Sequence, residues 1–577
     1  MNTYIINRVK AGALAVASLL ALHSSLFTLS SCVETDSSLV EYVDDNKLDS
    51  PNDTLYSVVG IINKMQVIAD RTVLLGELRG DLASITNYAS LDLQDVANFN
   101  VKADNPYCNP RDYYAIIQNC NYFIAKADTT LTKRGEKIFE KELGAVRAYR
   151  AWTYMQLAMN YGKVPFFTQP ILTEKDGDPS LYPSYSIADM VDFFIQDLTP
   201  YVDTKYPQYG AMNGMSSQKF FVPVRVLLGD LCLWAGRYKE AATYYHAYLT
   251  KLNDTHAIGS GAVSWYDYNF SNPRDAFASQ FSSPNGANVL TFIPMMEEEY
   301  DGIVCELDDV FCSTEDNNYY YQATYSNAYR ELSAAQRYVL VSTDPTTQLR
   351  DTISPAADFP FADEIMRGDL RLQSIYRLRS ATTNNDSYSL FRQTITKYTD
   401  PRCVVLYRLT HVYLRFAEAL NRAGIPEAAF AVLKYGLCEE NLIKNIGGET
   451  VDMLSPATRE KAGDLLNFSR YSFTAQNTMG IHSRGSGDAD ADTTYVIPSL
   501  PTLQDSILFV EDKICDEMAL ETSFEGTRFY DLIRLSQHRN DPSFLAKKVA
   551  SRNGSANFDA VLFSKLSDEK NWFLPLE

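Results

Sequence analysis

Few residue types in this 577-residue chain stand at spacings that support catalysis. Beyond the N-terminal segment the histidines are His246, His256, His411, His482 and His538. None of them belongs to an HExxH motif, and the sequence has no GxSxG motif and no glycine-rich loop that would hold phosphate. A glycoside hydrolase needs only two carboxylates about 5 to 10 Å apart, which the sequence does not exclude. A secreted hydrolase therefore stays an alternative that no motif supports.

One acidic run has the spacing of a metal site. Residues 488–492 read Asp-Ala-Asp-Ala-Asp, like the opening of a calcium-binding loop. The run lacks the glycine at the sixth position, and Ser499 stands where such a loop carries a bidentate glutamate. We therefore expect a solvated acidic turn, with no bound metal and no other cofactor.

The nine cysteines do not form a metal-binding pattern. Apart from Cys32 they are scattered without CxxC spacing, so they specify no zinc site. An oxidising compartment would permit disulfides, with Cys305 and Cys312 the nearest pair. Cys232 and Cys438 fall within helical patterns, and we expect both to be buried thiols.

The N-terminus has the pattern of a processing signal, in which two basic residues precede an apolar run. The run ends at Leu29-Ser30-Ser31-Cys32, which resembles the lipobox of bacterial lipoproteins. We expect residues 1–31 to be removed and Cys32 to be acylated, which would anchor the chain in a membrane without a spanning helix. An ordinary secretory peptide with an incidental cysteine is the alternative. Residues 32–52 are polar and are expected to form a flexible tether.

Charge and length limit the remaining possibilities. The 72 acidic residues outnumber the 52 basic ones, and the resulting net charge of −20 repels phosphate backbones. Nucleic acid is therefore not an expected partner. The folded part exceeds the usual limit for one core, about 250 to 300 residues, so an extended repeat architecture is expected.

Helical periodicity recurs in pairs. Residues 223–249 carry apolar stripes on two successive helices, with Gly236 between them, and the pattern returns at 405–437. Residues 112–127 and 136–161 form a third pair. Small residues at tetratricopeptide spacing, among them Gly229, would let the paired helices approach closely. We predict a mainly α, tetratricopeptide-like frame with helical-repeat regions at 53–250 and 399–577.

The region 251–398 interrupts this frame. Its helical pattern fades, and Pro, Gly, Asn and Ser recur among aromatic residues. We expect a long, loop-rich, irregular insertion. Ordered loops on a rigid frame are where binding residues concentrate, so the insertion is the predicted ligand side.

Residues 525–534 read E-G-T-R-F-Y-D-L-I-R, and residues 416–421 read F-A-E-A-L-N. They resemble the E-G-x-R-x-x-D-L-x-R signature and the central repeat of the SusD/RagB family of nutrient-binding outer-membrane lipoproteins of Bacteroidetes. Further similar stretches are 114–123, 142–165 and the closing segment 572–576. Departures from the family pattern include Lys141, Gly144, His411, Arg415, Met518, Thr522 and Glu577.

The resemblance implies a lid over a SusC-like TonB-dependent transporter, held on the outer membrane by lipid and facing the cell exterior. Such proteins capture oligosaccharides or, in RagB-like branches, peptides, and they perform no chemistry. A structural assembly lipoprotein is a further alternative. Glu525, Arg528, Asp531 and Arg534 recur every third residue, so we expect them to pair charges along one side of a helix.

A glycan site needs aromatic rings that stack on sugar C–H faces and polar groups that pair with hydroxyls. Residues 76–81 resemble the stretch ahead of the family's ligand-side loop, so we propose that an early loop and the insertion converge at one rim. Trp265 is the leading candidate for the stacking platform, because it is the one tryptophan in the insertion. The aromatic residues could instead fill local loop cores. The other candidates are Arg79, Asp81, Asn87, Tyr88, Tyr266, Tyr300, Asp301 and Asn317.

Overall fold

The computed structural model describes residues 48 and 51–576, except for several segments within that range. These are 252–257, 259–260, 267, 282–283, 296–302, 316, 357, 362, 381–390, 401, 469–472 and 475–477. The predicted signal peptide, Cys32 and most of the predicted tether lie outside the described residues. Helix α2 (Pro51–Gln66) already includes the last two residues of that tether. Among the helices that are described, none is both long and apolar enough to cross a membrane.

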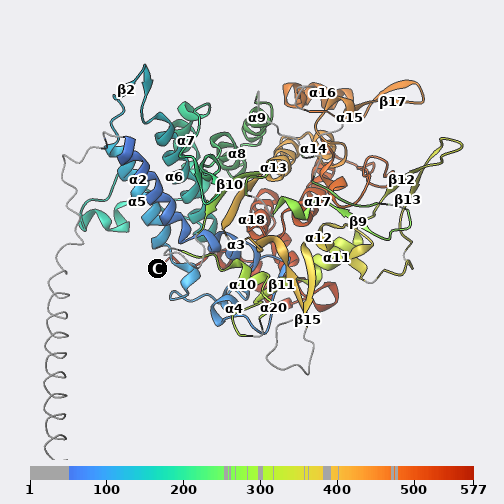
Figure 1. Ribbon diagram of the computed structural model, residues 1–577, viewed down its shortest axis with the longest axis horizontal. Helices are drawn as coiled ribbons and strands as arrows, with labels where there is room; N and C mark the ends of the chain where they lie inside the picture. Colours follow the sequence, from blue (N-terminus) through green and yellow to red (C-terminus); the bar gives the residue numbers. More distant parts are fainter. Residues whose placement is uncertain are drawn as a thin grey trace, which may run out of the picture. The chain divides into compact units, whose positions relative to one another are not determined.

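Three helical hairpins that the sequence predicted form the frame. In chain order they are α5 (Arg111–Lys126) with α6 (Glu140–Tyr161), α8 (Val224–Trp234) with α9 (Tyr238–Leu249), and α13 (Leu409–Arg422) with α14 (Pro426–Lys434). Helix α7 (Ile187–Leu198) packs against both α6 and α8, and α9 packs against α13, so the hairpins stack in sequence (Figure 1). The mainly α, tetratricopeptide-like frame is confirmed.

Two glycines make the α8–α9 hairpin possible. Gly236 has a φ of +73°, which allows the sharp turn between the helices. Gly229 faces Tyr245, and a Cβ atom at position 229 would lie only 2.5 Å from the tyrosine ring. The Tyr245 hydroxyl donates to Asp230 Oδ1 at 2.6 Å, which holds the ring in this place. The close helix approach predicted from Gly229 is therefore present.

The insertion is more regular than expected, because much of it forms short antiparallel hairpins. They are β8 (Val263–Trp265) with β9 (Pro273–Asp275), β12 (Leu340–Thr343) with β13 (Arg350–Ile353), and β14 (Tyr376–Ser380) with β15 (Phe391–Ile395). Between them lie α10 (Leu307–Phe311), α11 (Asn327–Ala335) and α12 (Arg371–Ile375). Strands of three to five residues are too short for apolar alternation to stand out among turn residues, which explains the difference.

Two strand pairs tie the insertion to the rest of the chain. Strand β10 (Val289–Pro294) pairs with β16 (Cys403–Arg408), which leads directly into α13. Strand β1 (Ala83–Ile85), which follows α3 (Ala69–Glu77), pairs with β11 (Ala323–Tyr325). The early part of the chain and the insertion are therefore joined by backbone hydrogen bonds.

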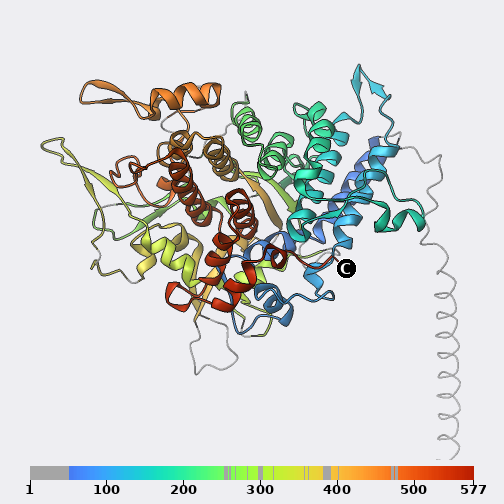
Figure 2. The same cartoon turned by 180° about the vertical axis from the view of Figure 1, so that it is seen from behind.

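The C-terminal helices close the fold against the N-terminal ones. Helix α17 (Leu503–Thr522) packs on α13 and α14, and α18 (Arg528–Arg539) packs on α3. Seen from behind, the red C-terminal helices lie beside the blue N-terminal segment (Figure 2). Helices α19 (Pro542–Ala550) and α20 (Ala560–Leu566) complete this end, before Trp572, which is buried.

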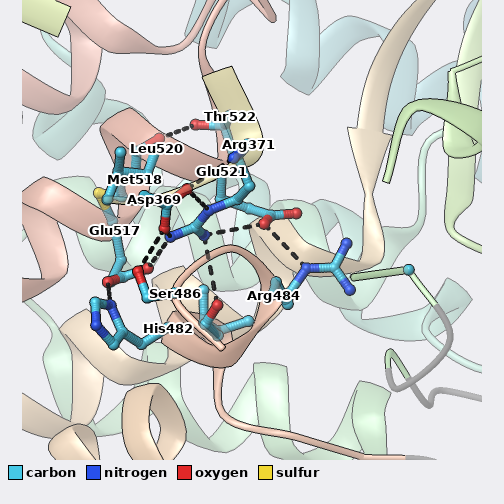
Figure 3. Close-up of polar contacts among 12 residues, drawn as sticks. Asp369, Arg371, His482, Arg484, Ser486, Glu517, Met518, Leu520, Glu521 and Thr522 are labelled. Carbon is cyan, nitrogen blue, oxygen red and sulfur yellow. Dashed lines mark hydrogen bonds and ion pairs between the residues drawn. The ribbon is translucent and has the colours of Figure 1, made fainter. Parts of the chain in front are cut away.

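A buried charge network joins α17 to the insertion and the frame. Glu521, with no exposed surface, accepts hydrogen bonds from Arg371, Arg408 and Arg484 at 3.2, 3.3 and 2.9 Å. Glu517, one helical turn earlier, accepts from Arg371 at 2.7 Å (Figure 3). Burial alone would raise the pKa of Glu517, but the charges of Arg371 and His482 lower it to about 2. Both glutamates are therefore structural carboxylates.

The signature residues also serve the frame, but not only along one helix. Asp531 and Arg534 pair within α18 at 2.7 Å, as predicted. Glu525 precedes the helix and instead binds Arg408 at 2.7 Å. Arg528 is buried and pairs with Asp81, which lies far away in the sequence. The prediction of a charge ladder along one helix face was wrong for these two residues, since tertiary partners replace helical neighbours.

The eight cysteines that the structure describes are all buried free thiols. Cys232 and Cys438 are therefore buried, as predicted. Cys305 and Cys312 are not joined: Cys305 Sγ donates to Asp70 Oδ1 at 3.3 Å, and Cys312 Sγ donates to Ile395 O at 2.7 Å.

Candidate ligand-binding site

The early loop and the insertion meet at one surface. Beyond the β1–β11 pair, Thr86 N donates to Gln322 O at 2.8 Å, and Tyr319 N donates to Tyr88 O at 3.0 Å. Ser90 N donates to the Gln322 side chain at 2.8 Å. Loop 86–90 and turn 317–322 therefore lie side by side, and this brings Asn87 and Tyr88 to the same surface as the turn that begins with Asn317.

The turn presents its tyrosines on unusual backbone. Tyr319 has a φ of +75° and Tyr321 a φ of +55°, conformations that cost about 1–3 kcal/mol each for residues with side chains. The surrounding contacts hold them there: Tyr321 N donates to Asp309 O at 2.7 Å, and the Tyr321 hydroxyl accepts from Gln393 N at 3.1 Å. The Tyr319 side chain is left 65% exposed, so this turn displays an aromatic ring to solvent.

An arginine from the next hairpin stiffens the cluster. Arg392 on β15 places its guanidinium carbon 4.5 Å from the Tyr88 ring centre and 5.3 Å from that of Tyr321. The two rings are themselves 6.4 Å apart. Arg392 also donates to Glu315 O and is 1% exposed. Cation–π contacts of this kind contribute about 0.5–2 kcal/mol each, which fixes the position of Tyr88 beneath the exposed surface.

Together these residues form what we call the tyrosine site: loop 86–90, turn 317–322 and Arg392. It combines the exposed Tyr319 ring and half-buried tyrosines with the exposed amides of Asn87 and Asn317. Aromatic faces and uncharged amides suit binding of a polyhydroxylated ligand. Among the described residues, no group of three or more His, Cys, Asp or Glu side chains is placed to hold a metal ion.

Arg79 and Asp81, two predicted ligand contacts, lie inside the protein instead. Arg79 is 1% exposed and donates to Leu75 O, Trp572 O and Asn160 Oδ1 at 2.8, 3.2 and 2.5 Å. Asp81 is 4% exposed and accepts two hydrogen bonds from Arg528, at 2.6 and 2.9 Å. Their polar groups are used internally, so the expectation that they face a ligand was wrong.

Trp265 is also buried, at 2% exposure, so it is not an exposed stacking platform. Its ring stacks on Phe361, with centroids 5.4 Å apart and planes 11° from parallel, and Phe270 meets its edge. This is the local loop core that the sequence left open as an alternative. Tyr266 is 78% exposed, but it belongs to the β8–β9 hairpin and not to the tyrosine site. Tyr300 and Asp301 lie outside the described residues.

Sequence reasoning missed Tyr319, Tyr321 and Arg392. The run Asn-Asn-Tyr-Tyr-Tyr at 317–321 was a usable signal, because it places three aromatic residues directly beside the candidate Asn317. No local pattern distinguishes Arg392, which reaches Tyr88 only through the pairing of distant strands.

Comparison with known proteins identifies the fold. No family model and no curated protein matches the sequence. A SusD superfamily protein from Bacteroides thetaiotaomicron superposes with a TM-score of 0.52 at 15% identity, covering 84% of this chain and 89% of that one. A SusD-like carbohydrate binding protein from Bacteroides vulgatus gives 0.51 at 15% identity, covering 84% and 83%. The surface glycan-binding protein A from Bacteroides fluxus gives 0.51 at 12% identity, covering 89% and 94%. The chain has a SusD-like fold.

Proposed function

We propose that the chain is a non-catalytic cell-surface lipoprotein of SusD type that captures an oligosaccharide and delivers it to a TonB-dependent outer-membrane transporter. The single observation that carries the binding role is the Tyr319 ring, held exposed on a strained backbone next to loop 86–90, where Asn87 is exposed. Strain of this kind is kept where the surrounding structure enforces it, and it concentrates at ligand-binding sites. The carbohydrate- and glycan-binding proteins among the superposed structures support the same class of ligand.

The geometry favours a sugar ring laid flat on Tyr319. A pyranose would place its C–H face on the phenol ring and direct its hydroxyl edge to the amides of Asn87 and Asn317. Arg392 is already engaged with Glu315 O and two tyrosine rings, so it positions the surface and does not itself contact the sugar.

The anchoring and delivery steps rest on the sequence and on the resemblance. The lipobox at Leu29-Ser30-Ser31-Cys32 and the polar tether supply the lipid attachment. The location at the cell surface and the SusC-like partner are inferred from the resemblance to SusD-like proteins. Mass spectrometry of the protein from membrane fractions should find a diacylglyceryl-modified Cys32 at the mature N-terminus.

Affinity electrophoresis and calorimetry with neutral polysaccharides test the binding role. Stacking that covers about 55 Å² of ring, at about 25 cal/mol per Å², corresponds to about tenfold in Kd. Tyr319→Ala should therefore weaken binding about tenfold. Tyr268→Ala is the matched control, because Tyr268 is 64% exposed, nearly as much as Tyr319, but lies outside the site.

Three results would contradict this proposal. Binding of peptides but of no polysaccharide would favour a RagB-like peptide receptor. Release of new reducing ends during long incubation would favour the hydrolase alternative. Equal weakening by Tyr319→Ala and Tyr268→Ala would place the site elsewhere.

A further inference from the structure

A hollow lies beside the β12–β13 hairpin, and no residue of the tyrosine site lines it. It consists of two adjoining cavities of about 440 and 340 Å³. Both cavities are lined by Val341 on β12, by Tyr435 after α14, and by Asp488 and Asp490. Because they share these four residues, the two cavities adjoin, and we call them together the trough. Its combined size lies in the range of small-molecule and oligomer sites, about 300–1,000 Å³.

Backbone hydrogen bonds hold the two walls of the trough together. Val339 N donates to Ser486 O at 3.0 Å, and Asp488 N donates to Val339 O at 2.7 Å. Gly487 between them has a φ of +78°, and a Cβ atom there would lie 2.0 Å from Val339 O. The aspartate turn is therefore fixed against the hairpin, and the trough exists before any ligand arrives.

Two polar side chains of the lining have an oxygen that accepts no hydrogen bond from a described residue, and aromatic rings line the same cavities. Asn441 Nδ2 donates to Tyr435 O at 2.8 Å, which leaves its amide oxygen for a ligand. Asp488 Oδ1 accepts from Ala491 N at 3.1 Å, and no described residue bonds to its second oxygen. Tyr435 is half-buried and lines both cavities, and Trp265 lines the larger one. Aromatic surface next to hydrogen-bonding side chains is the composition that sugars require.

Charge in the trough is balanced, which points away from strongly ionic ligands. The cationic side chains that line it are Lys434, Lys444 and Arg350, and the anionic ones are Asp351, Asp488 and Asp490. Three positive and three negative groups give no net charge. A polyanion or a polycation would therefore meet repulsion from half of the charged side chains in the lining.

A metal ion is also disfavoured at the run 488–492. Asp490 pairs with Lys444, and Asp492 is 3% exposed and bound by Arg337 Nη1 at 2.9 Å. The turn is thus held by ion pairs with two basic residues, and it is not the fully solvated turn that the sequence suggested. Two of its three carboxylates already have cationic partners.

We propose that this trough is a second saccharide site that takes a neutral oligosaccharide, with Tyr435, Asn441 and Asp488 as its contacts. The proposal rests on the proposed glycan-binding function and extends it to two separate sites on one chain. Two sites would let the protein hold a polymer at two points, so the observed affinity for long chains would exceed that of either site alone.

The test uses trisaccharides of a neutral α-glucan, β-glucan, mannan and galactan, which are too short to bridge separate sites, with trigalacturonate as the anionic comparison. Native mass spectrometry and calorimetry should find two molecules of one neutral trisaccharide per chain. Asp488→Asn keeps the acceptor for Ala491 N but loses the carboxylate, and Asn441→Ala removes the amide. Each should weaken one of the two binding events at least tenfold and leave the other unchanged.

Glu449→Ala is the control, since Glu449 is exposed on β18 (Glu449–Asp452) and does not line the trough. One bound trisaccharide per chain, lost in Tyr319→Ala and unaffected by Asp488→Asn and Asn441→Ala, would overturn the second site and leave the proposed function standing. Binding of trigalacturonate in preference to the neutral sugars would overturn the assigned ligand class. Absence of binding by every trisaccharide and polysaccharide would overturn both proposals together.

Discussion

Replacing Asp81 by asparagine should destabilise the protein strongly while saccharide binding stays unchanged. The Asp81 carboxylate accepts from Arg528 Nε at 2.6 Å and from Nη2 at 2.9 Å, in a bidentate pair. Burial alone would raise the pKa of Asp81, but the Arg528 guanidinium outweighs it and holds the pKa below its ordinary value. The pair is therefore ionised at neutral pH, and asparagine removes one charge with almost no change of shape.

The expected loss is about 3–5 kcal/mol, the range for removing one partner of a buried ion pair. Arg528 is 2% exposed and also donates to Cys515 O at 2.9 Å, so it cannot reach water without breaking that bond as well. Asp512→Asn is the matched control, because Asp512 pairs with Arg539 at 2.7 Å but is 57% exposed. An exposed pair of that kind contributes about 0–1 kcal/mol.

Urea unfolding followed by tryptophan fluorescence measures the stability, and calorimetry with the bound polysaccharide measures the affinity. We expect Asp81→Asn to lower the unfolding midpoint far more than Asp512→Asn, with Kd within threefold of wild type. The double variant Asp81→Leu with Arg528→Met should recover much of the loss, because well-packed apolar replacements of buried ion pairs are close to neutral. A variant of normal stability with tenfold weaker binding would refute the reasoning and return Asp81 to the ligand site.

Further predictions concern pH and packing. Burial raises the pKa of Glu77 to about 7, although hydrogen bonds from the backbone N–H groups of Phe524 and Gly526 lower it in part. The folded state therefore holds this proton longer than the unfolded state, so about 3 kcal/mol of stability should be lost between pH 4.5 and pH 7. Glu77→Gln should remove this loss, so its urea midpoint should differ less between pH 5 and pH 8 than that of the wild type. A variant midpoint shifted from wild type by the same amount at both pH values would contradict this. The pH dependence from Glu517 has the opposite sign, because its pKa in the folded state is lowered to about 2. It contributes about 3 kcal/mol of stability that is present above pH 4.5 and is lost as the pH falls toward 2. Acid unfolding of Glu517→Gln should consequently show a shallower pH dependence than wild type. Gly229→Ala should cost about 1–3 kcal/mol by forcing the Tyr245 ring aside, and unchanged thermal stability would argue against the close helix approach.

The helical frame could be predicted because its signals are local. Apolar stripes at helical spacing, Gly236 between α8 and α9 and Pro426 at the start of α14 each lie within one or two turns of the element they define. The short hairpins of the insertion gave no comparable signal. Their strands of three to five residues are too short to show a clear alternation. Strand β11 of the insertion pairs with the distant β1, as in the pairing of Ala83 with Tyr325, which no local pattern reveals.

The candidate site was predicted only in part, because burial is a property of the whole fold. The convergence of an early loop with the insertion follows from the β1–β11 pair, and Asn87 and Tyr88 lie at that surface. Arg79 and Asp81 have residue types suited to sugar binding, but Asp81 meets its partner Arg528 447 positions away in the sequence. No window of the sequence displays a partner at that distance.

The contrast between Asp81 and Tyr319 suggests how frame residues and ligand residues differ in such a fold. Asp81 is charged and satisfied: its carboxylate is fully paired, and its backbone carbonyl accepts from the Ser326 hydroxyl at 2.6 Å. Tyr319 is the reverse, since its backbone is held in a costly conformation and its ring contacts solvent. Folding alone gives no reason to keep an exposed tyrosine at a φ of +75°, whereas folding fully accounts for a buried ion pair between the bend after α3 and the start of α18. An exposed side chain on a costly backbone conformation is therefore a better guide to the ligand surface than a side chain that merely carries the expected chemistry.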